Sequence, residues 1–354
     1  MNENILKYQN PDWDMAKKRL EAFWHHEIID RPCLQIYVDT QEPEPMEACS
    51  YADRWLDPET FVRIESKSVK HRRYLGEAYP SFYPNWEGIS AMLGCSAEFD
   101  KNTIWVRPIG DSVLDLDFSG FSFDSDPVKK QIAKLSRIAE ICSGQYFLAM
   151  PPFGNSGDNL AMALGYENLC FDLVDEPAKV LELDGLITGM WKKLYDAFRA
   201  AITQHMDGMS WWLPAWHPGR SALIEFDFGA LISPEMYKMF LPNLLERAEY
   251  VDNCIYHLDG PGALPHLDTI LAQKEFDAVQ WEPGAGGGTF LSWLPVMKKI
   301  QEAGKGLYVG FVGVETDEAL ALLKELKPEG LIMPVHAKSM DEANRFLDTV
   351  NKMF

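Results

Sequence analysis

Hydrophobic residues occur along the chain in short runs, and amphipathic stretches separate most of the later runs. The apolar runs predict eight strands, at 33–39, 145–150, 207–214, 222–227, 253–259, 276–282, 306–312 and 330–336. Apolar positions at helical spacing predict helices at 12–27, 234–251, 263–273, 291–303, 315–326 and 339–352. Strands that are almost continuously apolar and alternate with helices are typical of parallel sheets. The pattern therefore predicts an α/β fold, a closed (βα)8 TIM barrel with an N-terminal helical arm over 1–30.

The segment 40–143 breaks this rhythm. It is rich in proline and aromatic residues, for example in the stretch 79–86 (YPSFYPNW). We expect helices and a small hairpin, inserted after the first strand and lying over the barrel mouth. An open doubly wound sheet is the alternative fold, but no glycine-rich phosphate-binding sequence follows the first strand. A chain of 354 residues without an internal repeat fits one decorated barrel, so we expect a single domain over 1–354.

The composition is that of a globular protein, with 47% hydrophobic and 24% charged residues. No apolar run approaches the roughly 18 residues of a membrane span, and the segment 1–7 lacks the apolar core of a secretion signal. Six cysteines are scattered without a CxxC pair, which favours reduced thiols. The net charge of −20 argues against nucleic acid or an anionic membrane as a partner. We expect a soluble, cytoplasmic protein.

Ionisable side chains stand at the ends of three predicted strands. His257 and Asp259 end the fifth strand, and side chains at i and i+2 of a strand share a face, so both can converge on one ion or one substrate atom. Glu282 ends the sixth strand and His336 ends the eighth. Catalytic residues of a TIM barrel come from these carboxyl ends. The four residues together predict a site for a divalent metal, zinc or another ion, although they could instead bind polar substrate atoms without a metal.

Further candidate residues surround the fourth predicted strand and the insertion. Asp227 ends the fourth strand and His217 precedes it, and we expect one of them to transfer a proton. The candidate substrate-binding residues are aromatic: Trp216 in the loop beside His217, and Tyr83 and Trp86 in the insertion.

Two other features have a plain structural interpretation beside a functional one. Trp211 and Trp212 point to opposite faces of their predicted strand, where a core position is as consistent with the pattern as a ligand wall. The glycine-rich segment 284–288 is more typical of a connecting loop than of a lid or a backbone cradle for an anion.

Four segments occur in a specific order along the chain: Ile29-Asp30-Arg31-Pro32, the segment 152–177 (beginning PFG and ending DEP), Phe226-Asp227-Phe228-Gly229, and the segment 231–242 (beginning LISPE and ending FLP). Their order resembles the uroporphyrinogen decarboxylase superfamily over most of the chain. The first is similar to that family's entry into strand one, the second to its helix after strand two, and the last two to its fourth-strand signature. The resemblance implies the (βα)8 barrel that the hydrophobic pattern also predicts, and a homodimer.

That family contains decarboxylases and corrinoid-linked methyltransferases. Its decarboxylases bind porphyrin carboxylates with a Met-Arg-Gln-Ala-Gly-Arg stretch after strand one, whereas the segment 36–45 here reads IYVDTQEPEP and is acidic. Its methyltransferases hold zinc with a His-x-Cys pair, a later Cys and often a Glu. His257 and Glu282 match the histidine and the glutamate, Asp259 stands where the first cysteine would be, and His336 lies near the second. The resemblance therefore implies a methyltransferase-like chain with harder ligands than thiolates, which would favour an oxygen or nitrogen ligand or a metal other than zinc.

Three classes of function remain open on the sequence. The first, which we favour, is methyl transfer from a small O- or N-methylated molecule, with a corrinoid protein as candidate acceptor and the metal as Lewis acid. The second is a metal-assisted lyase or decarboxylase that acts on a non-porphyrin carboxylate. The third is a barrel that binds a ligand or a partner without catalysis. Absence of metal from the purified protein would favour the third class or an acid–base lyase.

Overall fold

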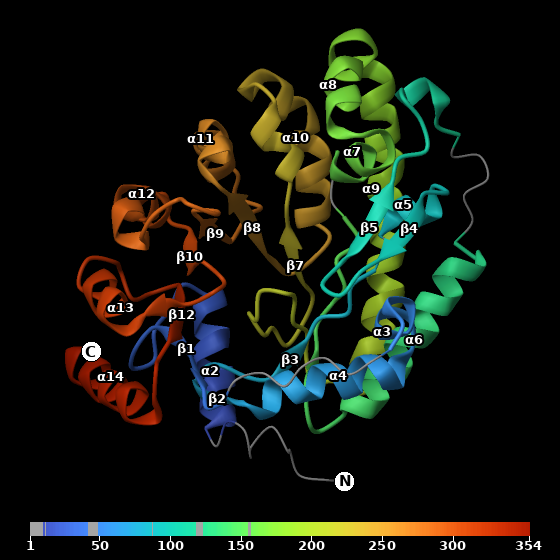
Figure 1. Cartoon of the computed structure of the whole chain (residues 1–354). Helices are drawn as coiled ribbons and strands as arrows, with labels where there is room; N and C mark the ends of the chain where they lie inside the picture. The colour runs from blue at the N-terminus through green and yellow to red at the C-terminus, as the bar shows by residue number, and fades with distance from the viewer. Residues whose placement is uncertain (1–9, 11, 42–48, 87, 118–122, 155–156) are drawn as a thin grey trace.

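A mostly parallel β-sheet forms the centre of the computed structural model, which describes residues 10, 12–41, 49–86, 88–117, 123–154 and 157–354. Its strands follow the order β2–β1–β12–β10–β9–β8–β7, with β11 beside β12 (Figure 1). The bounds are β1 Cys33–Asp39, β2 Arg72–Gly76, β7 Ser221–Ile224, β8 Asn253–Asp259, β9 Ala278–Glu282, β10 Gly306–Val309, β11 Val314–Glu315 and β12 Leu331–His336. From β7 to β12 the neighbours in the sheet follow chain order, without the reversal of a doubly wound sheet. The predicted α/β class is confirmed.

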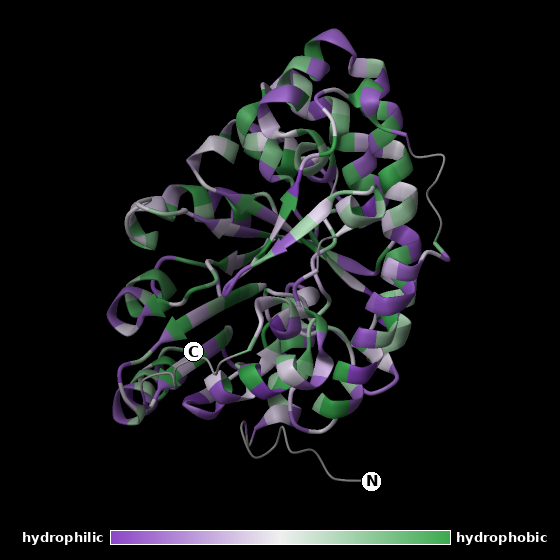
Figure 2. Cartoon of the chain, turned by 45° about the vertical axis from the view of Figure 1, so that its right-hand side comes forward, coloured by the Kyte–Doolittle hydropathy of each residue, from purple (hydrophilic) through white to green (hydrophobic). Residues whose placement is uncertain are grey.

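Helices separate these strands, and Figure 1 shows α10 to α14 in a row outside the sheet. The bounds are α2 Trp13–Trp24, α10 Pro234–Ala248, α11 Leu267–Leu271, α12 Leu294–Glu302, α13 Thr316–Leu323 and α14 Met340–Met353. The Ser233 hydroxyl caps α10 by accepting the Met236 N–H, and Ser339 caps α14 through the Glu342 N–H. Hydrophobic and hydrophilic residues alternate along the helices, as expected where one side packs on the sheet (Figure 2). Within the described ranges, no helix combines the length and hydrophobicity needed to cross a membrane.

Two of the predicted strands differ in the structure. The run 145–150 keeps only β6, Phe147–Leu148, which pairs with β3, Ser81–Phe82, of the insertion. The run 207–214 forms no strand, because Met209 exchanges two backbone hydrogen bonds with His217 and the chain folds back on itself. In the part of the chain that the structure describes, the main sheet ends at β7 and at the antiparallel β2. Closure of the barrel therefore stays a prediction.

The insertion contains the predicted helices and hairpin. The helices are α3 Tyr51–Leu56, α4 Pro58–Lys70, α5 Ile89–Met92 and α6 Asp126–Cys142, and β4 Ser96–Phe99 pairs with β5 Ile104–Arg107 in the hairpin. After β6 the chain continues into α7 Asp158–Leu164, α8 Tyr166–Asp175 and the long α9 Pro177–Thr203, against which α6 packs. Residues 42–45 of the acidic segment and residues 1–9 and 11 of the N-terminal arm lie outside the described residues.

Buried polar side chains line the inner face of the sheet below the strand ends. The Tyr308 hydroxyl donates to Gln35 Oε1 at 2.7 Å, and the β9–β10 register places Tyr308 beside Gln280. Gln35 also donates to the backbone oxygen of Pro214 and so holds the fold-back segment against this face. Because buried amides and hydroxyls require partners, these contacts fix which residues face inward. His257 neighbours Gln280 in the β8–β9 register and therefore faces inward as well.

A buried ion pair fixes the start of β1. Arg31 donates to both carboxylate oxygens of Glu77, at 2.7 and 3.0 Å, and the Leu34 N–H donates to the same carboxylate at 2.6 Å. Glu77 is fully buried, and Arg19 of α2 also donates to it at 3.0 Å. Gly76 has a φ of +62°, and a Cβ there would lie 2.2 Å from the Leu34 oxygen, so only glycine fits. Arg31 of the segment 29–32 thus has a structural role.

Candidate metal centre

Three side chains converge at the carboxyl ends of β7 and β8. His257 and Asp259 belong to the end of β8, and Asp227 opens η2, Asp227–Leu231, a 3-10 turn that follows β7. Each residue offers one ligand atom, and these atoms lie within 4.8 Å of one another. The His257 Nε2 atom is 4.0 Å from Asp227 Oδ1. One imidazole and two carboxylates at this spacing can hold a divalent ion such as Zn²⁺.

Gln280 sets the orientation of the His257 ring. The parallel register places the two residues side by side, and Gln280 Oε1 accepts a hydrogen bond from His257 Nδ1. With the proton on Nδ1, the lone pair of Nε2 is available on the side where Asp227 lies. Metal-binding histidines commonly have such a partner on the second ring nitrogen. Gln280 is fully buried, so water does not compete for this contact.

Glu282 lies beside Asp259 in the same register. Its Oε2 atom is buried without a hydrogen-bond partner among the described residues. Burial raises the pKa of Glu282, and the negative charge of Asp259 raises it further. This predicted ligand therefore borders the three-residue cluster with one oxygen still available.

Asp158 at the start of α7 fixes the turn that contains Asp227. Its carboxyl oxygens accept the backbone N–H groups of Asp227 at 3.3 Å and Phe228 at 2.8 Å. Burial raises the pKa of Asp158 well above its usual range, and the charge of Asp227 adds to this effect. Partial loss of water also raises the pKa of Asp227, an effect that His257 opposes and Asp259 reinforces. The carboxyl groups resist ionising together unless a cation offsets their repulsion.

The structure does not bring His336 into this cluster. β10 separates its strand from β9, and the His336 Nε2 atom lies 3.2 Å from Asp39 Oδ2. Arg72 donates to both oxygens of Asp39, at 2.7 and 3.0 Å. These three residues line a cavity of about 300 Å³ whose other walls include Tyr37, Tyr74, Tyr79, Tyr83, Trp211, Trp212 and Phe311. His336 thus belongs to an aromatic cavity next to the cluster.

Trp212 connects the aromatic cavity to the cluster. Its ring lies 5.1 Å from the His257 ring in a T-shaped arrangement, and 5.7 Å from the ring of Phe311. The fold-back of residues 209–217 brings Trp212 to the inner face. The sequence pattern left a core position and a ligand wall equally open for Trp211 and Trp212. In the structure, Trp212 lies beside His257 of the candidate metal site.

The two predicted substrate-binding residues of the insertion lie near Asp227. Tyr83 and Trp86 line a cavity of about 240 Å³ together with Asp158, Glu225 and Asp227. Burial, together with the negative charge of Glu225, raises the pKa of Tyr83 to about 12. Its hydroxyl therefore stays protonated near neutral pH and can donate a hydrogen bond into the cavity.

His217 and Trp216 lie at the opposite end of the sheet. His217 Nε2 is 3.1 Å from Asn253 Oδ1, where β8 begins, whereas Asp259 stands where β8 ends. A strand of this length spans about 20 Å. Trp216 packs on α2, with its ring 6.1 Å from that of Trp13. A proton-transfer role for His217 and a pocket role for Trp216 do not fit these positions.

His217 should make the stability of the fold sensitive to acid. Burial lowers the pKa of His217, so the folded state favours the neutral ring. The stabilisation that the neutral His217 ring provides is complete above the unfolded-state pKa of about 6.5. It is lost as the pH falls toward the lower pKa of His217 in the folded state. Replacing His217 with Gln, which can still bond to Asn253, should flatten the decline in the free energy of unfolding between about pH 7 and 5, measured with urea. An unchanged decline would contradict the inference.

The sequence pattern singles out neither Gln280 nor Asp158. Gln280 stands two residues before Glu282 on the same face, so the i, i+2 rule that pairs His257 with Asp259 could have found it. Asp158 begins a helix far from the other site residues in the chain, and no local signal marks it.

Comparisons with known proteins show similarity in fold. No protein-family model matches the sequence, and a search of curated proteins finds no match either. Among solved structures, a methyltransferase from Methanosarcina mazei is similar, with a TM-score of 0.62 at 13% sequence identity. The match covers 96% of this chain and 98% of that one. The chain has a methyltransferase-like fold.

Proposed function

We propose that the chain is a methyltransferase that acts on a small O- or N-methylated molecule. The main support is the group formed by Asp227, His257 and Asp259 at the ends of adjacent parallel strands, in a chain similar to a methyltransferase over almost its full length. Active sites of TIM barrels occupy this end of the strands. The same likeness supports a closed (βα)8 barrel and a place near the methyltransferases of the uroporphyrinogen decarboxylase superfamily, both of which are part of the proposal.

Asp227, His257 and Asp259 are the proposed ligands of a divalent metal, with zinc as one candidate. The donor set fits such an ion, because Gln280 orients the imidazole and the two carboxylates repel each other without a cation. Three protein ligands leave a coordination position for substrate. When bound, the metal would supply Lewis acidity at the methylated oxygen or nitrogen.

Glu282 is the proposed proton donor. Demethylation leaves an oxygen or nitrogen atom that must gain a proton. The Glu282 Oε2 atom is buried and lacks a partner among the described residues, and Glu282 lies beside Asp259 in the β8–β9 register. Trp212 and Phe311 would cover the substrate on the side of the aromatic cavity and exclude water. A corrinoid protein as acceptor and a homodimer complete the proposal, and both derive from the family resemblance.

Methyl transfer to a free corrinoid tests the proposal. Protein loaded with Zn²⁺ is mixed with cob(I)alamin and a panel of O- and N-methylated molecules, and methylcob(III)alamin is followed by its absorbance. Cobalt(I) supplies the electron pair of the new Co–C bond, the methyl bond to oxygen or nitrogen breaks, and that atom gains a proton. Glu282→Gln should slow the transfer at least about 100-fold with unchanged metal content. Release of CO₂ from carboxylates without methyl transfer would favour a lyase, and absence of both metal and turnover would favour a non-catalytic barrel.

Replacing Asp259 with Cys should raise the affinity for zinc by at least about ten-fold, because it introduces a thiolate ligand. Methyl transfer should fall, since the softer ligand weakens the Lewis acidity of the metal. Competition with a chromophoric chelator measures the zinc affinity. The control variant Asp259→Asn, which removes the charge at constant size, should lower the zinc affinity. If Asp259→Cys changes neither zinc affinity nor activity, Asp259 is not a ligand and the cluster is better explained as hydrogen-bond partners of a substrate.

A further inference from the structure

The aromatic cavity beside the candidate metal centre contains a row of three side chains with polar ends. The β1–β12 register places Tyr37 beside His336, and the antiparallel β1–β2 register places Tyr37 beside Tyr74. Residues opposite each other on neighbouring strands point to the same face of a sheet. The rings of Tyr37 and Tyr74 lie 5.9 Å apart in a T-shaped arrangement, as this register requires. The three side chains therefore form one row across β12, β1 and β2, and all three line the cavity.

The hydroxyls of Tyr37 and Tyr74 supply hydrogen-bond donors to this row. Neither hydroxyl has a hydrogen-bond partner among the residues that the structure describes, although Tyr74 is only 5% exposed. Burial raises the pKa of both side chains, so both hydroxyls stay protonated near neutral pH. Buried hydroxyls of native proteins normally have a partner. We therefore expect a molecule in the cavity that accepts a hydrogen bond from them.

His336 adds a hydrogen-bond acceptor to the row. The hydrogen bonds from Arg72 hold the pKa of Asp39 low, so the Asp39 carboxylate is ionised and only accepts. The His336 Nε2 atom, 3.2 Å from Asp39 Oδ2, therefore carries a proton, and in the neutral ring Nδ1 keeps a lone pair. Arg72 and Asp39 cancel each other's charge. An uncharged group that both donates and accepts a hydrogen bond therefore suits this corner of the cavity.

Flat side chains form much of the remaining wall: Tyr79, Tyr83, Trp211, Trp212 and Phe311. Contacts hold several of these rings in place. The Trp211 indole donates to the backbone oxygen of Ser221 at 3.0 Å, and the ring of Trp212 lies 5.7 Å from that of Phe311 at an angle of 89°. The volume of about 300 Å³ is at the lower end for sites of small organic ligands. The size and the walls thus suit a molecule with one flat ring.

We propose that the aromatic cavity binds a small phenol, a molecule with one flat ring and one hydroxyl group. The hydroxyl would donate to Nδ1 of His336 and accept from Tyr37 or Tyr74, because a hydroxyl is both a donor and an acceptor. The ring would pack against Trp212 and Phe311. The proposed function gives this cavity only a covering role. Binding of a phenol depends on neither the metal nor methyl transfer, so it is tested on the protein without either.

Calorimetric titration of the whole protein with matched probes tests the proposal. p-Cresol has the flat ring and the hydroxyl, p-xylene has a methyl group of similar size in place of the hydroxyl, and 4-methylcyclohexanol has the hydroxyl on a ring that is not flat. p-Cresol should bind at least about ten-fold more tightly than 4-methylcyclohexanol, because only the flat ring stacks on the aromatic walls. Equal affinities for these two alcohols, or no binding of p-cresol, would overturn the proposal.

His336→Phe tests the contact to the hydroxyl, because it keeps a flat ring and removes the nitrogen acceptor. The ratio of the p-cresol affinity to the p-xylene affinity should fall about ten-fold, which corresponds to one hydrogen bond. The ratio is the appropriate measure, since p-xylene packs in the same place without using the acceptor. The double variant Tyr37→Phe with Tyr74→Phe removes both donors and should lower the same ratio. It is available if His336→Phe fails to fold.

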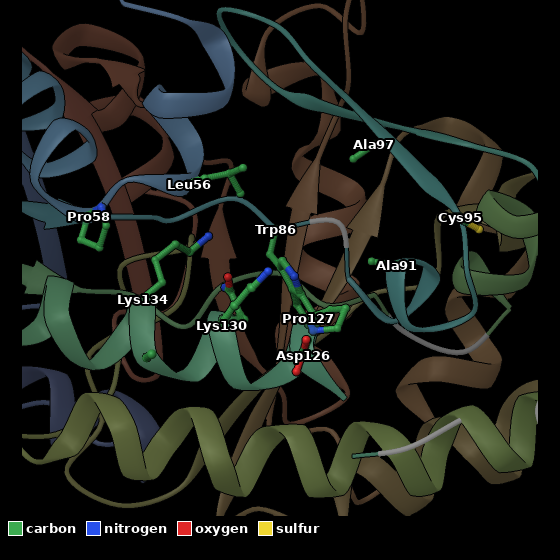
Figure 3. A pocket seen from close by; sticks show the side chains of 12 residues that line it. Leu56, Pro58, Trp86, Ala91, Cys95, Ala97, Asp126, Pro127, Lys130 and Lys134 are labelled. Carbon is green, nitrogen blue, oxygen red and sulfur yellow. The ribbon is translucent and has the colours of Figure 1, made fainter. Parts of the chain in front are cut away.

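A larger cavity in the insertion is the alternative location for an aromatic probe. Its volume is about 700 Å³, and α3, α4, α5, β4 and α6 contribute to its walls (Figure 3). Ala91 belongs to this wall, so Ala91→Phe narrows the larger cavity and should leave the p-cresol affinity within about two-fold. Trp212→Ala opens the aromatic cavity and should weaken p-cresol at least about ten-fold. An unchanged affinity ratio in both polar variants, or loss of p-cresol binding by folded Ala91→Phe, would overturn the proposal.

Discussion

His257→Ala is expected to remove bound metal and to abolish methyl transfer together. The imidazole is the one nitrogen donor of the proposed three-residue metal site, and its loss leaves two carboxylates that repel each other. Activity should fall at least about 100-fold, because a Lewis-acid metal contributes several kcal/mol to catalysis. The fold should survive with a loss of about 1–3 kcal/mol, since the buried Gln280 loses its hydrogen-bond partner. Elemental analysis, the transfer assay and urea unfolding measure the three effects.

His217→Gln is the matched control for that experiment. It also replaces a buried histidine of an amide-bonded pair, but at the other end of β8. It should keep both metal and activity. If His257→Ala retains a full complement of metal, or if His217→Gln loses it, the assignment of the centre to the carboxyl ends of β7 and β8 is wrong.

Arg31→Met is expected to cost about 3 kcal/mol in the free energy of unfolding, near the low end for breaking a buried ion pair. Glu77 would remain fully buried while losing two hydrogen bonds, and among the described residues Arg19 and the Leu34 N–H would still donate to it. Urea denaturation gives the loss. The double variant Arg31→Met with Glu77→Gln should recover part of it, because no uncompensated charge then remains.

Arg137→Met applies the same substitution to an arginine whose ion pairs are exposed. Arg137 forms ion pairs with Glu59 and Glu140 at 2.8 Å each, but its side chain is 48% exposed. Its replacement should cost less than about 1 kcal/mol, because water and salt screen such pairs. Equal losses for Arg31→Met and Arg137→Met would show that burial of the Glu77 pair does not govern its contribution.

Local patterns predict an element where the apolar run or the capping residue that marks it lies within or next to the element itself. The strand 253–259 agrees with β8 residue for residue, and α10 and α14, whose starts are capped by serines close by in the chain, lie within the predicted helices 234–251 and, to within one residue, 339–352. The run 207–214 fails because its apolar residues are buried without joining the sheet. Trp211, for instance, is buried and its indole donates to the Ser221 oxygen. Where a backbone finds its partner depends on distant residues, which the hydrophobic pattern does not reveal.

Strand geometry also predicts one part of the candidate site and misses another. His257 and Asp259 come together through strand geometry, and Asp227 joins them because consecutive strands of a parallel sheet are neighbours. His336 stands at a strand end that faces inward, as the pattern predicts, but pairs with Asp39. Arg72 of the insertion strand β2 holds Asp39 there. The strand β2 runs antiparallel to β1 and does not belong to the alternation of parallel strands and helices. Its contribution to the site was therefore not predictable from that alternation.

The pairing of β1 with β12 has a consequence for how the chain folds. Cys33 lies opposite Ile332, so this ladder joins positions almost three hundred residues apart in the chain. The contacts between Arg19, Arg31 and Glu77 are far more local and can form early during synthesis on the ribosome. Until the last strand emerges, one edge of β1 offers unpaired backbone groups to other chains. We therefore expect ribosome-bound chains that end before β12 to depend on chaperones and to aggregate when they are released.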